Sequence, residues 1–118
     1  MSERIYITAV FENVAFIGIA KAGKLKDKNY RMCVFKCIDK NSRFYEKSFR
    51  MNVFMEHSFV NKLGHVEQNA HEVIKHNLIP GTVFENLLLV KNKYATPENK
   101  LDEYVLSYYN TNVKILKR

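Results

Sequence analysis

Lysines, arginines and aromatic rings are the residues of this sequence best suited to chemistry, and they gather in the stretches 21–29, 30–50 and 91–100. Cations track the phosphates of a nucleic acid, while flat rings stack on unpaired bases. The mixture therefore predicts binding to single-stranded nucleic acid. The candidate contact residues are Lys24, Lys26, Lys28, Tyr30, Arg31, Lys36, Arg43, Phe44, Arg50, Lys91, Lys93 and Tyr94.

The overall charge favours the same class of partner. Nineteen Lys and Arg against twelve Asp and Glu give a net charge of +7, with a pI near 9.4. An excess of this size on a small body attracts polyanions, of which nucleic acid comes first. A lysine-rich loop can be merely solvated surface. Two such loops, 21–29 and 91–100, lie far apart in the sequence, and together they favour a binding role.

The histidines and cysteines give no sign of a metal or cofactor site. The histidines His57, His65, His71 and His76 miss the three- and four-residue spacings that align ligands on a helix face. No His-Glu-x-x-His or Cys-x-x-Cys motif is present. Cys33 and Cys37 lie in one apolar run that reads as a strand, which holds them roughly 13 Å apart. On a helix the same spacing would place both thiols on one face. On the strand reading, we expect two buried, inert thiols, with no metal and no cofactor.

Acidic residues offer only a weak alternative chemistry. Glu12, Glu46 and Glu85 lie in separate predicted strands and could in principle converge as a small nuclease site. No glycine-rich phosphate loop or nucleophile elbow accompanies them. We therefore expect a binding protein rather than an enzyme.

The elements that must position these residues follow from periodicity. Alternation of apolar and polar residues predicts strands, and an apolar stripe at Val66, Ala70, Val73 and Ile74 predicts a helix. We expect Gly18 to allow a bend in the long first strand. The predicted strands are 5–20, 30–39, 43–55, 82–91 and 104–116, and the predicted helix is 64–77.

This order of three strands, a helix and two strands resembles the OB fold, a five-stranded Greek-key barrel. The resemblance implies an all-β fold with one helix between the third and fourth strands. It also implies that the basic segments 21–29 and 91–100 are the loops that flank an oligonucleotide-binding face. An SH3-like barrel and a small α+β sheet are the alternatives. The 118 residues are expected to form one domain over 1–118.

Strand alternation divides the aromatic residues between core and surface. Phe49, Met51, Val53 and Met55 share one parity and are predicted to face the core. Phe44, Arg50 and Asn52 are then predicted to face outward. The apolar stretches are too short to cross a bilayer, and the polar start is unlike a signal peptide, so we expect a cytoplasmic protein.

The small basic OB-like barrel, rich in lysine, asparagine and tyrosine, resembles the single-stranded DNA-binding proteins of bacteriophages, of the lactococcal type. The resemblance implies a non-catalytic, homo-oligomeric coat for single-stranded DNA in replication and recombination, acting in the host cytoplasm. Bacterial relatives end in an acidic tail, whereas this sequence ends in a basic one, so replication or recombination partners would use the barrel surface. The alternatives are a protein-interaction module that inhibits a host complex and a small nuclease.

Overall fold

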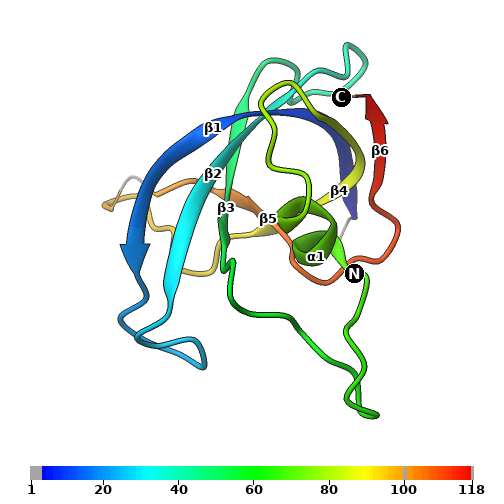
Figure 1. The fold of residues 1–118 in the computed structure, drawn as a ribbon. Coiled ribbons are helices and arrows are strands. Elements are labelled where there is room, and N and C mark those ends of the chain that lie inside the picture. The colour runs from blue at the N-terminus through cyan, green and yellow to red at the C-terminus, as the bar shows by residue number, and fades with distance from the viewer. Residues whose placement is uncertain (1–3, 100, 118) are drawn as a thin grey trace.

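The computed structural model describes residues 4–99 and 101–117, which form one antiparallel sheet and one short helix (Figure 1). No helix in this part of the chain is long and apolar enough to cross a membrane. The strands are β1 (Ile5–Ile19), β2 (Asn29–Cys37), β3 (Ser48–Val53), β4 (Val83–Lys91), β5 (Tyr104–Leu106) and β6 (Lys114–Lys117), and the helix is α1 (Ala70–Lys75).

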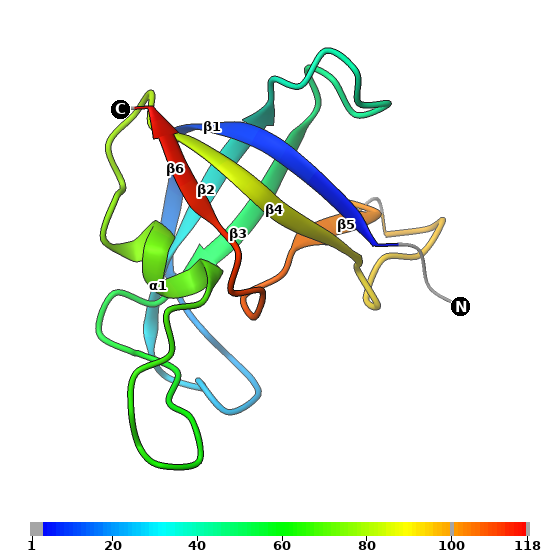
Figure 2. The ribbon, with the colours of Figure 1, turned by 90° about the vertical axis from the view of Figure 1, so that its right-hand side faces the viewer.

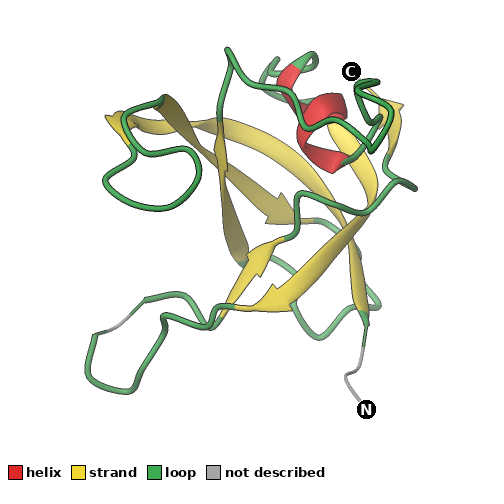
Figure 3. Ribbon diagram, turned by 90° about the horizontal axis from the view of Figure 1, so that it is seen from below, coloured by secondary structure: helices red, strands yellow, loops and turns green. Residues whose placement is uncertain are grey.

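The sheet curls into a nearly closed barrel. Its strands lie in the order β3-β2-β1-β4-β5, with β6 paired to β4. β3 and β5, at the two ends of this path, contact each other (Figure 3). Closure of this kind removes exposed strand edges. The predicted OB-type five-stranded barrel, with its helix between the third and fourth strands, is confirmed.

The predicted fifth strand, 104–116, is instead two short strands that pair with opposite ends of β4 (Figure 2). Asn86 lies between these two pairings with a φ of 67°. The Asn86 side chain donates to the carbonyl of Asn112 at 3.1 Å, and the Asn110 side chain donates to the carbonyl of Asn86 at 2.7 Å. These amides satisfy backbone groups that a continuous strand would have paired.

β1 is bent, as predicted, because it pairs with β4 in its first half and with β2 in its second. Register shifts lie between Phe11 and Asn13 and between Val14 and Phe16 against β2, and between Ile7 and Ala9 against β4. The bend is therefore upstream of Gly18, and its predicted place was wrong. Gly18 has a different use, since a Cβ there would lie 2.9 Å from the Tyr30 hydroxyl.

The barrel interior is filled by the alternate residues of the strands. The rings of Phe11 and Phe35 lie 5.5 Å apart, and those of Phe35 and Phe84 lie 5.8 Å apart. The predicted inward parity of β3 is confirmed for Phe49, Met51 and Val53, whereas Met55 lies beyond the strand and is exposed. Cys33 and Cys37 are buried and free, and burial raises the pKa of the Cys33 thiol to about 11.

The helix is shorter than the predicted 64–77. Asn69 caps it by accepting a hydrogen bond from the Glu72 N–H at 3.0 Å. Ahead of it, Asn61 accepts from the Leu63 N–H at 2.9 Å, and Gly64 has a φ of 81°. This local turn competes with a helix, because a short polar side chain supplies the backbone's hydrogen bond.

Phe44 does not lie in a strand, and its predicted outward orientation was wrong. The predicted strand 43–55 begins only at Ser48, because residues 39–47 form a longer turn. Ser42 accepts from the Phe44 N–H at 3.1 Å and turns the ring inward. Phe44 is 7% exposed and packs edge-on against Phe49 and Tyr104, at 5.6 and 5.4 Å.

Candidate nucleic-acid interface

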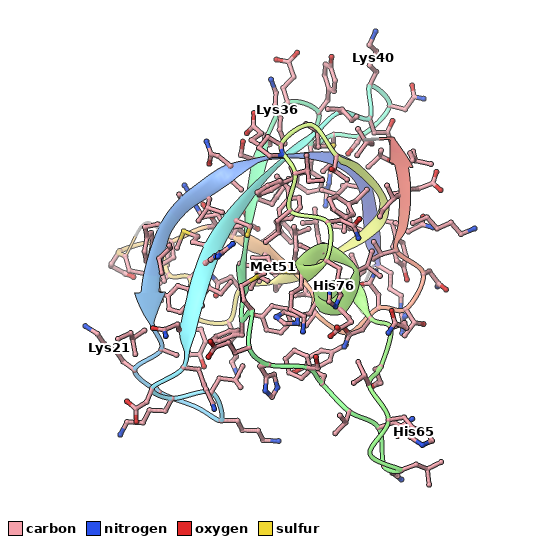
Figure 4. The ribbon with its side chains drawn as sticks, in the orientation of Figure 1. Lys21, Lys36, Lys40, Met51, His65 and His76 are labelled. Atoms are coloured by element: carbon pink, nitrogen blue, oxygen red, sulfur yellow. The ribbon has the colours of Figure 1, made fainter. Side chains whose placement is uncertain are left out.

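An open groove of about 890 Å³ lies between the outer face of β3 and the segment that connects β4 to β5. Strand alternation builds its floor. Met51 points into the barrel (Figure 4), so Arg50 and Asn52 point outward, as predicted. Apolar residues such as Met32, Leu101 and Val105 line the groove together with the polar and aromatic side chains Arg50, Asn52, Lys91, Lys93, Tyr94 and Tyr109.

The cations of the groove differ in their partners. Arg50 is hydrogen-bonded to Asp102 across the groove, and Lys91 lies 3.0 Å from Glu103. This hydrogen bond and the charge of Glu103 raise the pKa of Lys91. Among the described residues no carboxylate pairs with Lys93. Its Nζ lies over the Tyr94 ring instead, 5.2 Å from the ring centre. Because Lys93 has no carboxylate partner among these residues, it is the groove cation most available to an incoming phosphate.

Two tyrosine rings stand exposed beside these cations. Tyr94 is 68% exposed and Tyr109 is 65% exposed. The Tyr94 backbone is held in place, since its carbonyl accepts from the Asn99 side chain at 2.6 Å. Tyr109 packs edge-on against Phe59, at 5.6 Å. Fixed backbones with exposed rings are suited to stacking on unpaired bases.

The loop between β1 and β2 carries a second group of cations. Lys24, Lys26 and Lys28 are all exposed. The loop is ordered, because Ala20 and Lys28 share a backbone hydrogen bond of 3.0 Å. This loop and the β4–β5 segment both lie toward the left in Figures 1 and 3, but Figure 2 separates them, with the loop below the barrel and the segment beside it. None of the loop's residues lines the groove, so its part in binding stays a prediction.

A row of outward-facing side chains runs from the groove floor toward the loop between β1 and β2. Phe16, Met32 and Asn52 are successive partners in the β1–β2 and β2–β3 pairings. Phe16 is 46% exposed, and its ring lies 5.9 Å from that of Tyr30. Tyr30 is half-buried and packs edge-on against the more exposed Phe16 ring.

The remaining predicted contacts lie elsewhere. Lys36 and the neighbouring Lys40 lie at the end of the barrel opposite to Lys21 (Figure 4). Arg43 lies in the turn 39–47 with its guanidinium 4.8 Å from the Phe44 ring. Arg31 is exposed at the start of β2 and pairs with Ile17. The structure therefore brings Arg50, Lys91, Lys93 and Tyr94 together and leaves Lys36 and Arg43 apart from them.

Sequence reasoning missed four residues of this surface: Phe16, Met32, Asp102 and Tyr109. The outward position of Met32 could have been found, because it neighbours the buried Cys33 in a strand. Asp102 and Tyr109 could not, since they enter the groove through the β4–β5 closure.

The titratable groups outside the groove form no metal site in the described residues, where no three His, Cys, Asp or Glu side chains lie close enough to hold an ion. Glu12, Glu46 and Glu85 are thus not gathered into one cluster.

His71 is fully buried, and its Nε2 accepts from the Phe54 N–H at 3.0 Å. Burial, followed by the nearby Lys75, lowers the pKa of His71 to about 4.

The groove, its exposed rings and the two basic loops are thus the features from which a function can be inferred. They combine positive charge with exposed aromatic rings. Comparisons of the chain with protein-family models, with curated proteins and with solved structures found no match.

Proposed function

We propose that this protein binds single-stranded DNA along the groove and coats it with little sequence preference and without catalysis. One observation carries the proposal: the exposed rings of Tyr94 and Tyr109 line the same groove as Lys91 and Lys93. Rings supply stacking on any base, and cations supply attraction to any phosphate. Neither interaction reads the base sequence.

The exposed rings of the site favour a single strand over a duplex. A ring can stack only on a base whose face is exposed, and paired bases in a duplex cover each other's faces. The floor residues Met32 and Asn52, which are partners in the β2–β3 pairing, add a weakly polar surface to the groove. A strand that runs from Tyr94 toward Phe16 would meet rings at both ends of this path.

The wider proposal follows the resemblance to phage single-stranded DNA-binding proteins. The protein would act in the host cytoplasm, as a homo-oligomer, when single strands are exposed in replication or recombination. Protein partners would bind the barrel surface outside the groove.

Fluorescence anisotropy with a labelled oligothymidine, a matched RNA and a matched duplex, each at two salt concentrations, tests the proposal. Oligothymidine should bind more tightly than duplex. If Lys24, Lys26, Lys28 and Lys93 each neutralise one phosphate, the log–log salt slope should be about −3.

Three outcomes would contradict the proposal. Equal or tighter binding of the duplex at matched salt would remove the single-strand preference. Degradation of the strand on addition of Mg²⁺ would favour a nuclease. Weak binding of all three, with no dependence on the loop lysines, would favour a protein-interaction module.

A further inference from the structure

We propose that Asp102 and Glu103 hold the groove cations Arg50 and Lys91 in the free protein, and that the DNA backbone displaces them from these cations when a strand binds. The inference rests on the proposed function, because it concerns how the groove cations meet a phosphate. It makes the two carboxylates positioning residues, which orient Arg50 and Lys91 and compete with the ligand for them.

Asp102 lines the groove, whereas Glu103 lies just outside it, in a small hollow beside Phe44 and Lys47. Asp102 Oδ2 accepts a hydrogen bond from Arg50 Nη1 of β3, and Glu103 Oε1 accepts one from Lys91 Nζ of β4 at 3.0 Å. All four side chains are substantially exposed. Ion pairs in such solvated places are weak. A phosphate can therefore replace either carboxylate at little cost.

The exchange needs no movement of the backbone. The Asn92 N–H donates to the Glu103 carbonyl at 2.8 Å, and the Asn92 side chain donates to the Asp102 carbonyl at 2.9 Å. Lys91 and Tyr104 are partners in the β4–β5 pairing. These contacts hold the segment on β4, so the carboxylates leave by rotation of their side chains alone.

The exchange has a distinctive salt dependence. Salt weakens the attraction of Arg50 to a phosphate, but it equally weakens the attraction of Arg50 to Asp102. The two effects partly cancel in the natural protein. Removing the carboxylate removes this cancellation, so binding should become tighter at low salt and more sensitive to salt. Removing a cation such as Lys93 should do the opposite.

The test is oligothymidine anisotropy at about 50 and about 200 mM salt with Asp102→Asn and Glu103→Gln. Glu98→Gln is the matched control, because it removes one carboxylate from the same exposed segment. We expect the first two variants to bind two- to five-fold more tightly than the control at low salt. Their salt slopes should be steeper by up to about 0.7 each.

Affinities and slopes equal to those of the control, or weaker binding, would overturn this inference alone. Absence of oligothymidine binding by the natural protein would overturn the proposed function as well. A thermal melt of each variant accompanies the titration. If Asp102→Asn lowers stability, Glu103→Gln decides the outcome, since its partner Lys91 lies at the exposed end of β4.

Discussion

Replacing Tyr94 by Leu should weaken single-strand binding without loss of stability. The ring is 68% exposed, and its backbone is held by Asn99, so the substitution removes a stacking face and leaves the loop intact. Stacking of one base on a ring is worth about 1–3 kcal/mol. The dissociation constant for oligothymidine should therefore rise by about 5- to 150-fold.

The salt dependence and the melting temperature make this prediction specific. Stacking involves no charge, so the salt slope of the variant should equal that of the natural protein. The melting temperature should stay the same within about 2 °C, since exposed substitutions change stability by less than about 0.5 kcal/mol.

Phe44→Ala is the matched comparison, because this ring is buried against Phe49 and Tyr104. It should cost about 3–5 kcal/mol of stability and leave the affinity of the folded protein unchanged. The reasoning would be refuted if Tyr94→Leu melted like Phe44→Ala, or if it bound oligothymidine as tightly as the natural protein.

Three further predictions concern the first loop and the region around α1. Replacing Lys24, Lys26 and Lys28 by Gln should flatten the salt slope by up to about 0.7 per contact; an unchanged slope would exclude the loop. Lys75→Met should cost about 3 kcal/mol in urea unfolding, because it leaves the buried Glu72 without its 3.1 Å partner. The pKa of His71 is lowered to about 4, so the unfolded chain binds protons first below about pH 6.5. Stability should then fall by about 2 kcal/mol from pH 7 to pH 5, and a constant urea midpoint would contradict this.

The strand order and the core were predictable because each strand contains its own signal. Cys33, Phe35 and Cys37 alternate with outward residues, and the same alternation in β3 correctly placed Arg50 outward. Burial of one face fixes the register wherever alternation is unbroken. The prediction failed for Phe44, where a turn interrupts the alternation and reverses the direction of the ring.

The groove itself was only half predictable. Charge and composition indicate Lys91, Lys93 and Tyr94. These residues lie in or beside a loop, and loops run over the protein surface, so their exposure could be expected from the sequence. The pairing of Arg50 with Asp102 spans 52 residues and exists only because β3 and β5 meet in the closed barrel. No local pattern contains that information, and the same holds for Tyr109.

The central claim is that a single DNA strand lies in the groove and extends from there toward the loop between β1 and β2. Mapping of ¹H–¹⁵N chemical shifts on addition of oligothymidine tests it most directly, residue by residue. The largest shifts should fall on Asn52, Lys93, Tyr94 and the loop between β1 and β2. Shifts confined to Lys36 and Lys40, at the end of the barrel opposite to Lys21 (Figure 4), would contradict the claim.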